Sequence, residues 1–407
     1  MPADRTIYDD LEVPTVINGA GTKTRIGGSL IREDALEAMH EAGSAFVRLS
    51  DLQAKASELI AEVTGGEAGY VASGGAACLT LAAAACIAGD DPATMARLPE
   101  TADVADEIVV PRTHRTGYDH ALRVAGASIV DVGTNDRRLG TGAADVEPWE
   151  LADAITDETA AVGYVAKPSL SPDLETVAEL AHEHDVPVIV DAAAELPPAS
   201  NLERFIEAGA DLVAFSGGKA IRGPQTTGIL AGKRRYIESA ALQHLDTHAA
   251  AEVWDPPRAL FDPDAFDGVP RQGIGRPMKV GKEELVGVIV ALEAFLEEDH
   301  DARHEEWTER AERIVAGLED AFAHDVSITA AEKTAVVPEV VVSVDEDELG
   351  RTTADLVLAL RREDPRVFVG TDHLENAQFT VNPMCLTGKE AEYLVERVMS
   401  NLEDGSR

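Results

Sequence analysis

The sequence predicts an α/β protein with two domains: a large one built on a mostly parallel seven-stranded sheet, and a smaller C-terminal α+β domain. Short apolar runs alternate with helical stretches from about residue 50 to residue 235, as in a parallel sheet covered on both faces. From Lys282 onwards, long amphipathic helices replace this alternation. We therefore expect residues 1–45 to form a segment that packs on the site, residues 46–280 the large domain and residues 281–407 the small domain.

The individual elements follow from the same periodicities. The strands expected in the large domain are Ala68–Ala72, Glu107–Pro111, Ser128–Val132, Ala161–Ala166, Pro187–Asp191, Asp211–Phe215 and Gly228–Ala231, with helices at Cys78–Ile87, Asp173–His184 and Asn201–Glu207. In the small domain we expect helices at Glu283–Glu297, Ala302–Phe322, Thr353–Arg361 and Lys389–Asn401, and strands at Val326–Thr329, Glu339–Val344, Val367–Val369 and Gln378–Val381. In the sequence, the strands of the larger sheet therefore precede the long helices of the small domain.

The charge of the chain excludes several classes of function. Lys and Arg number 35 and Asp and Glu 74, so the net charge is 35 − 74 = −39, and most of the basic residues are arginines. Such a surface repels phosphate backbones, so no nucleic-acid partner is expected. Acid dispersed along the whole chain is typical of proteins adapted to a high-salt cytoplasm, although an ordinary acidic enzyme is the alternative.

The remaining composition predicts a cytoplasmic protein without a metal site. The chain contains no apolar run long enough for a membrane helix, and its N-terminus lacks the layout of a signal peptide. Its three cysteines form no C-x-x-C pair, and His182 and His184 lie two residues apart on a predicted helix, so they face different sides. We expect no membrane partner and no metal.

The segment with the most chemical information surrounds Lys219. An apolar strand leads into Ser216-Gly-Gly-Lys219, which is followed by Gly223-Pro-Gln225. A lysine at a strand end among glycines can reach into a cleft, where partial desolvation lowers its pKa and permits Schiff-base chemistry. A lysine in a solvated loop is the alternative if Lys219 is considered alone.

Asp191 ends another apolar run, Pro187–Asp191. Its carboxylate is therefore expected at the carboxyl edge of the sheet, where α/β proteins bind ligands. A strand-end Asp together with a cleft Lys fits a pyridoxal 5'-phosphate site, in which Asp191 pairs with the pyridine nitrogen and Lys219 binds the cofactor covalently. A helix N-cap is the alternative role for Asp191.

A seat for the cofactor phosphate is predicted where a strand meets an apolar helix. The backbone N–H groups of Gly74, Gly75 and Ala76 open that helix, and Ser73 can add a hydroxyl. Ser216 is a second candidate phosphate donor. An ordinary N-cap at Ser73 is the alternative.

These residues together resemble the fold-type I pyridoxal phosphate enzymes, and among them the bacterial selenocysteine synthase (seryl-tRNA selenium transferase) family. The matching segments are Val16–Gly21, Ser73–Ala77, the strand ending at Asp191, Ser216–Lys219 and Gly223–Gln225. The resemblance covers roughly residues 10 to 400. It implies the fold-type I architecture, pyridoxal phosphate as cofactor and Lys219 as the Schiff-base lysine.

The resemblance also implies further site residues. His114 corresponds to the ring that stacks on the cofactor face, with His120 as a competing candidate. Thr226 and Thr227 fall where related enzymes reach the phosphate of a neighbouring subunit, so a homodimer or higher homo-oligomer is implied. From the residues themselves, Arg222, Gln225, Arg276 and Lys279 are candidates for substrate binding. Arg276 or Lys279, with Arg222 as a further candidate, could hold a carboxylate or phosphate, and a surface basic pair is the alternative for Arg276 and Lys279.

Two departures from the transfer-RNA-acting members point to the small-molecule branch. Those members carry a tRNA-binding region before the Val-Ile-Asn segment, which starts here by Val13, and their phosphate cup is rich in asparagine whereas this one is Ser-Gly-Gly. The small-molecule branch includes ammonia-lyases of sugar amino acids such as D-glucosaminate 6-phosphate. We therefore expect a lyase that catalyses α,β-elimination from a small β-hydroxy or sugar amino acid, giving a 2-oxo acid and ammonia.

Three alternatives stay open at this stage. Selenium-transferase-type β-replacement on seryl-tRNA would need a basic tRNA surface. Transamination, racemisation and aldol cleavage use the same cofactor site. A non-catalytic regulator or scaffold stabilised by the cofactor would turn over no amino acid.

Overall fold

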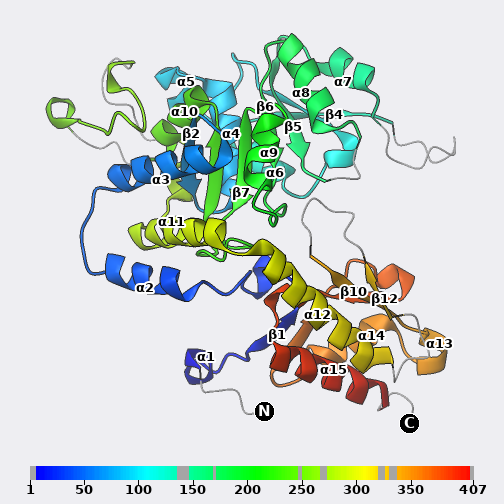
Figure 1. The fold of residues 1–407 in the computed structure, drawn as a ribbon. Coiled ribbons are helices and arrows are strands. Elements are labelled where there is room, and N and C mark those ends of the chain that lie inside the picture. Colours follow the sequence, from blue (N-terminus) through cyan, green and yellow to red (C-terminus); the bar gives the residue numbers. More distant parts are fainter. Residues whose placement is uncertain are drawn as a thin grey trace. The chain divides into compact units, whose positions relative to one another are not determined.

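The computed structural model describes residues 6–134, 146–167, 171–245, 250–265, 273–319, 326–329 and 337–403. The chain divides into two compact units. One contains Ile31–Glu298, and the other combines the segment up to Leu30 with Asp299–Arg407. Figure 1 shows the elements of both units along the chain.

The larger unit contains the predicted seven-stranded sheet. Its strands, in spatial order, are β2 (Ala68–Ala72), β8 (Gly228–Gly232), β7 (Leu212–Ser216), β6 (Val188–Asp191), β5 (Thr159–Val165), β3 (Glu107–Pro111) and β4 (Ser128–Val132). Strands β7 to β4 run parallel, whereas β8 is antiparallel to both of its neighbours. The seven expected strands and the mostly parallel character of the sheet are thereby confirmed.

Helices cover this sheet in two groups (Figure 1). The first group comprises α4 (Gly75–Ala88), α5 (Pro92–Arg97), α6 (Asp119–Val124) and α10 (Arg234–His244), and the second α3 (Leu49–Thr64), α7 (Pro148–Ala154), α8 (Leu174–Glu183) and α9 (Asn201–Glu207). Helix α4 is apolar on all sides because it lies between the sheet and α10, and nearly all of its residues are buried.

The larger unit, Ile31–Glu298, extends beyond the range 46–280 that the sequence pattern predicts for the large domain. Helix α11 (Lys282–Glu297) packs on α2 (Glu33–Ala42), and both belong to the unit that contains the large sheet. The apolar face of α11, including Leu285, Val288 and Phe295, is buried there. The change of periodicity at Lys282 therefore marks a change of secondary structure within this unit.

Side chains of α3 protect the edge strand that leads to Ser73. The Gln53 amide donates to the Val71 carbonyl at 2.8 Å and accepts the Val71 N–H at 3.1 Å. The Ser57 hydroxyl accepts the Gly69 N–H at 3.0 Å. These contacts satisfy backbone groups of β2 that face no further strand, and so fix the approach to the predicted phosphate seat.

The smaller unit has an antiparallel sheet and an additional parallel strand pair. Strands β9 (Val326–Thr329), β10 (Glu339–Ser343) and β12 (Gln378–Val381) form the sheet, and β1 (Val16–Gly19) pairs with β11 (Arg366–Val369). The helices are α1 (Ile7–Asp10), α12 (His300–Glu319), α13 (Glu346–Leu349), α14 (Thr353–Leu360) and α15 (Gly388–Glu403). Residue Phe322, the predicted end of one helix, lies outside the described residues.

Strand β1 was not predicted, because it is only four residues long and its partner lies about 350 residues further along the chain. The glycine-rich turn after it is held by Asn18, whose side chain accepts the Ala20 N–H and donates to the Gly21 carbonyl, both at 3.0 Å. Gly21 has φ +74°, a conformation that favours glycine. The glycines in this segment are therefore explained by local backbone geometry.

Within the described ranges, no helix is both long enough and apolar enough to cross a membrane. The same part of the chain contains no group of three His, Cys, Asp or Glu side chains placed to hold a metal ion.

Candidate active site

The predicted site residues gather at one edge of the seven-stranded sheet. Because β3, β5, β6 and β7 are parallel, their carboxyl ends share this edge. Gly228 at the start of β8 pairs with Ser216 on one side and with Ala72 on the other. The segment after β2, which begins at Ser73, therefore opens at the same edge as Asp191 and Ser216.

Asp191 is the last residue of β6, and its carboxylate accepts the Ala193 N–H at 3.1 Å. Burial raises the pKa of this carboxyl group above its usual value, while the Ala193 N–H and the positive charges of Lys219 and Lys167 oppose the rise. A desolvated carboxylate of this kind gains most from a cationic hydrogen-bond donor. Asp191 is only partly exposed, so a ligand on the edge of the sheet can supply that donor.

The loop from Ser216 to Gly228 places Lys219 near Asp191. Gly217 donates its N–H to the Thr227 carbonyl at 2.9 Å, and Gly223 donates to the Gly217 carbonyl at 2.8 Å. A Cβ atom on Gly218 would lie 2.4 Å from the Cα of Gln225, so the two arms of the loop touch. Lys219 is thus held on a closed backbone loop, and its charge acts on the Asp191 carboxyl group.

Three predicted residues lie on this same loop in different environments. Arg222 is half-buried with φ +59°, and its N–H donates to the Lys219 carbonyl at 3.0 Å. Thr227 is fully buried, and its hydroxyl donates to the Pro224 carbonyl at 2.6 Å. Thr226 is exposed, with its hydroxyl 3.5 Å from the Glu284 carboxylate. Of the two threonines, Thr226 is the one with an exposed side chain.

The predicted phosphate seat lies where β2 passes into α4. Gly74 has φ +105°, and a Cβ atom on Gly228 would lie 2.2 Å from the Gly74 carbonyl carbon, so two backbones touch here. The Gly74 N–H, predicted to bind phosphate, donates to the Ala72 carbonyl at 2.8 Å. The N–H groups of Gly75 and Ala76, in the first turn of α4, have no acceptor within the helix and are open to an anion. Ser73, which directly precedes these residues, is exposed, so its hydroxyl is also accessible to an anion.

His114 lies in the 3₁₀ helix η2 (Arg112–His114) after β3, and its ring is almost fully buried. Its Nδ1 atom lies 3.1 Å from the Val165 nitrogen and 3.0 Å from the Val165 oxygen, and its ring packs on Tyr164 with 4.3 Å between centroids. Burial lowers the pKa of His114 to about 4, and the Lys167 charge adds to this. The ring is therefore neutral at pH 7. The competing candidate, His120, is exposed on α6.

A small cavity of about 30 Å³ connects His114 with Asp191, and Leu79, Val110 and Ile189 contribute apolar walls. About one water molecule fills that volume. The neutral imidazole of His114 and the desolvated carboxylate of Asp191 therefore line the same cavity.

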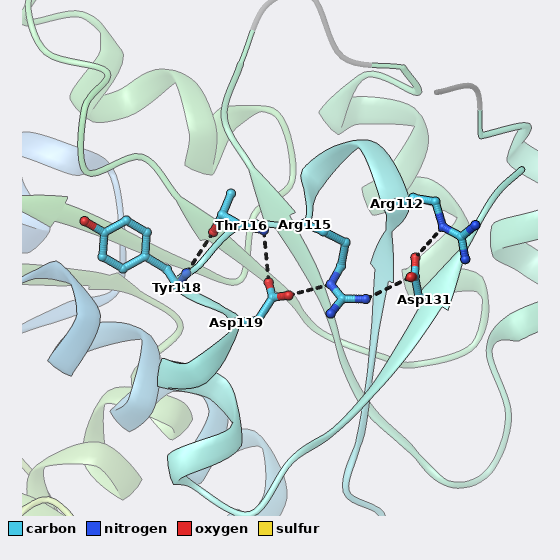
Figure 2. Close-up of polar contacts among 6 residues, drawn as sticks. All are labelled: Arg112, Arg115, Thr116, Tyr118, Asp119 and Asp131. Carbon is cyan, nitrogen blue, oxygen red and sulfur yellow. Dashed lines mark hydrogen bonds and ion pairs between the residues drawn. The ribbon is translucent and has the colours of Figure 1, made fainter. Parts of the chain in front are cut away.

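A chain of ion pairs fixes the segment that carries His114 (Figure 2). Asp131 on β4 accepts from Arg112 at 3.1 Å and from Arg115 at 3.0 Å, and Arg115 also pairs with Asp119 at 2.5 Å. Asp119 in turn accepts the Thr116 N–H at 3.3 Å. Arg112 and Arg115 are thus engaged with carboxylates of the protein itself.

Arg276 and Lys279 line a second, larger cavity of about 300 Å³. Lys282, which pairs with Glu283, and His244 contribute to the same wall, and the described lining residues include no acidic side chain. The 3₁₀ helix η6 (Arg276–Met278) adjoins the phosphate seat, because the Ser73 N–H donates to the Met278 carbonyl at 3.1 Å. The cavity therefore suits an anionic group of a molecule bound at the sheet edge.

One residue near the site has no counterpart among the sequence predictions. Lys167 follows the end of β5, and its charge acts on both His114 and Asp191. The signal that could have revealed it is the one that revealed Asp191, a polar residue directly after an apolar strand.

The described residues satisfy the chemical requirements of pyridoxal phosphate. They provide a desolvated carboxylate for the pyridine N–H, a lysine within reach of that carboxylate, and open helix N–H groups beside a glycine crossing for the phosphate. The close backbone contact between Gly74 and Gly228 is the observation that favours a built phosphate seat over an ordinary helix cap.

Comparison with known proteins gives consistent matches. The family model described as "SelA: L-seryl-tRNA selenium transferase" matches residues 16–249. The chain is 30% identical to a D-glucosaminate-6-phosphate ammonia lyase of Salmonella typhimurium, over 96% of each chain. It is 29% identical to a 5'-C-glycyluridine monooxygenase-decarboxylase of Streptomyces sp, covering 98% of this chain and 92% of that protein. An L-seryl-tRNA(Sec) selenium transferase of Geotalea uraniireducens is 27% identical over 56% of this chain and 51% of its own.

Solved structures show the same relationship in three dimensions. A D-glucosaminate-6-phosphate ammonia-lyase superposes with a TM-score of 0.79 at 27% identity, covering all of both chains. A serine palmitoyltransferase from S. paucimobilis with bound pyridoxal phosphate has the same fold, with a TM-score of 0.55 at 13% identity over 96% of this chain and 87% of that chain. The architecture is thus the fold-type I architecture expected from the sequence.

Proposed function

Since the chain belongs to the L-seryl-tRNA selenium transferase (SelA) family, we propose that it is a lyase that removes ammonia from a small β-hydroxy or sugar amino acid. Its cofactor is pyridoxal 5'-phosphate. The observation that carries the proposal is the placement of the desolvated Asp191 carboxylate and Lys219 together at the sheet edge that also holds the open N–H groups of α4. Near-full-length similarity to an ammonia lyase supports a small-molecule substrate.

The residues proposed to hold the cofactor are those of the sheet edge. Asp191 accepts the pyridine N–H, Lys219 is the covalent attachment point, and Ser73, Gly75 and Ala76 bind the phosphate, with Ser216 as a further donor. When bound, the cofactor supplies an electron sink that stabilises negative charge at the substrate α-carbon. His114, which its pKa of about 4 keeps neutral, is proposed to adjoin the cofactor ring from the small cavity that it shares with Asp191.

Lys219 is proposed to carry the proton transfers. With its Nζ atom unbound, Lys219 would take the α-proton and return a proton to the departing β-hydroxyl group. Departure of the α-proton and hydroxyl releases one water molecule. Hydrolysis of the resulting enamine consumes one, so the net products are a 2-oxo acid and ammonia.

Basic residues near the site are proposed to set the substrate class. Arg276 and Lys279, in the cavity of about 300 Å³, would hold an acidic group of the substrate at a distance from the reacting carbon. Arg222 and Gln225 lie on the loop of Lys219 and would contact the substrate from that side. A phosphorylated or polyhydroxylated amino acid is the substrate that uses all of these groups.

We further propose that the protein acts as a homodimer or a higher homo-oligomer. The exposed Thr226 hydroxyl would donate to the cofactor phosphate of a second subunit, whereas Thr227 stabilises its own loop through Pro224. Sedimentation of the purified protein gives the oligomeric state. In mixed oligomers, a Thr226→Ala subunit is expected to weaken cofactor binding in its partner.

A screen of amino acids with paired assays for 2-oxo acid and ammonia tests the proposed activity. Serine, threonine, D-glucosaminate and D-glucosaminate 6-phosphate are the first substrates, and the Lys219→Ala variant is the control. Equal yields of 2-oxo acid and ammonia that depend on Lys219 support the lyase. Transfer of the amino group to an acceptor 2-oxo acid without release of ammonia would contradict it.

Beta-replacement on seryl-tRNA is the second candidate, because the matching family model carries that activity in its description. The discriminating measurement is binding and conversion of seryl-tRNA. Consumption of serine on the tRNA would favour this candidate over the lyase.

A further inference from the structure

Lys167 occupies a position at the sheet edge that is fixed by the neighbouring strand. Val165, the last residue of β5, lies opposite Asp191 in the parallel register. The Ala166 N–H donates to the Asp191 carbonyl at 2.9 Å, so the backbone is still paired one residue before Lys167. Lys167 is therefore the first side chain beyond the strand pair that ends in Asp191.

Its ammonium group is accessible and has no acidic partner. Lys167 is exposed, and no hydrogen bond or ion pair joins it to another residue in the described part of the chain. Its charge is nonetheless felt by the two groups on either side, since it lowers the pKa of both His114 and Asp191. Because Lys167 is exposed beside the site and has no carboxylate partner among the described residues, its ammonium group is available to an anionic ligand.

The other cations near the site have different tasks. Lys219 is the proposed attachment point of the cofactor, and Arg112 and Arg115 pair with Asp131. Arg276 and Lys279 line a cavity that adjoins the phosphate seat at Ser73. On the side of Asp191 and His114, Lys167 is the cation that the described structure offers to a substrate.

We propose that Lys167 binds the α-carboxylate of the amino-acid substrate through its ammonium group, an inference that rests on the proposed function. An ammonium–carboxylate contact is a charge-assisted hydrogen bond, which fixes both the presence and the position of the carboxylate. Held in this way, the α-carboxylate lies at the carboxyl end of β5, while the distal acidic group of the substrate extends towards Arg276 and Lys279. The substrate class that follows is an amino acid with two separate anionic groups.

The test compares an amine that carries a carboxylate with one that does not. The probes are serine and serinol, which share the amine and the hydroxyl group, and binding is read from the change in cofactor absorbance in the holoenzyme. Wild-type protein is expected to bind serine at least about tenfold more tightly than serinol. Lys167→Gln should weaken serine binding by about 10- to 100-fold and leave serinol binding unchanged, because a hydrogen bond to a charged group is lost.

Two further variants sharpen the result. Lys167→Arg keeps the charge and should recover part of the serine affinity. Lys55→Gln, which removes an exposed lysine of α3 paired with Glu58, should behave like wild-type protein. An unchanged ratio of serine to serinol affinity in Lys167→Gln, or no discrimination between the two probes by wild-type protein, would overturn the assignment.

The outcome is separable from that of the proposed lyase activity. Binding is read from the initial change in cofactor absorbance and not from product, so a protein that releases no ammonia can still show the Lys167-dependent preference for serine. Conversely, a lyase whose carboxylate preference does not depend on Lys167 keeps the proposed function and loses only this inference.

Discussion

Replacing Asp191 with Asn tests the central electrostatic contact of the proposed site. Asparagine has nearly the same shape and can still accept the Ala193 N–H that now lies 3.1 Å from the carboxylate. What it removes is the negative charge opposite the pyridine nitrogen. The variant therefore separates the charge of Asp191 from its contribution to the fold.

The expected magnitude follows from where the carboxylate lies. Asp191 is partly exposed, but burial is the largest cause of the shift in its pKa. The attraction between its carboxylate and the pyridine N–H is therefore weaker than in a dry protein interior and stronger than in bulk water. Two unit charges about 4 Å apart at an effective dielectric constant of about 20 interact by about 4 kcal/mol. If that energy is expressed in the transition state, kcat falls about 1000-fold.

The assay measures ammonia release under saturating substrate together with the cofactor content of the purified variant. Cofactor should remain bound, because the phosphate seat at Ser73, Gly75 and Ala76 is unchanged. Glu175→Gln, which neutralises an exposed carboxylate of α8, is the matched control and should leave kcat as in wild-type protein. An Asp191→Asn enzyme with full cofactor and near-normal kcat would refute the assigned contact.

Further predictions concern the cofactor link, the phosphate seat, pH and tRNA. Borohydride treatment followed by peptide mapping should find the cofactor on Lys219, and a label on any other lysine would contradict the assignment. Gly228→Ala should weaken cofactor binding at least about tenfold and destabilise the fold by about 1–3 kcal/mol, because the Cβ atom of the alanine would lie 2.2 Å from the Gly74 carbonyl carbon. Cofactor titration measures the first effect and thermal unfolding the second. His114 and His244 are both buried with pKa values of about 4, so between pH 4 and 6.5 each binds fewer protons in the folded than in the unfolded protein. Each should therefore lower the free energy of unfolding by about 2 kcal/mol as the pH falls from 7 to 5. Urea unfolding at both pH values checks this, and the His244→Gln variant should show the shallower pH dependence. Seryl-tRNA should show no saturable binding in either low or molar salt, as measured by filter binding.

The strands of the large sheet and two of the central site residues could be predicted because they depend on local patterns. Asp191 and Lys219 both follow apolar runs, and the carboxyl ends of parallel strands meet at one edge. Lys167 obeys the same rule after β5 but was overlooked, because a single lysine gives no signal without knowledge of which strands are adjacent. Strand order, which puts β5 beside β6, is the information that the sequence pattern lacks.

The hydrogen bonds inside turns could not be predicted from the residue types either. The sequence marks Gly74 as a phosphate donor, but the structure engages its N–H with the Ala72 carbonyl. It marks Thr226 and Thr227 as equivalent, but Thr227 is buried with its hydroxyl bonded to Pro224. These outcomes depend on backbone torsion angles over a few residues, which composition and spacing do not determine.

The distribution of charge reconciles an acidic protein with an anionic substrate. The whole chain carries −39, yet the residues around the sheet edge include Lys167 and Lys219, and the described lining of the neighbouring cavity includes Arg276 and Lys279, while Lys282 in the same lining is paired with Glu283. A local reversal of sign in a concave site attracts a small anion even when the surrounding surface repels large ones.

The same arrangement separates a small dianion from a polyanion. A nucleic-acid backbone needs a row of free cations, whereas Arg112 and Arg115, which lie in sequence next to the site, are engaged with Asp131 and Asp119 (Figure 2). At molar salt the Debye length falls to about 3 Å, so the repulsion from the acidic surface is screened while contacts at hydrogen-bond distance persist. High salt therefore favours the short contacts that a carboxylate and a phosphate can make with two separate cation clusters, and does not create the continuous basic surface that a tRNA requires.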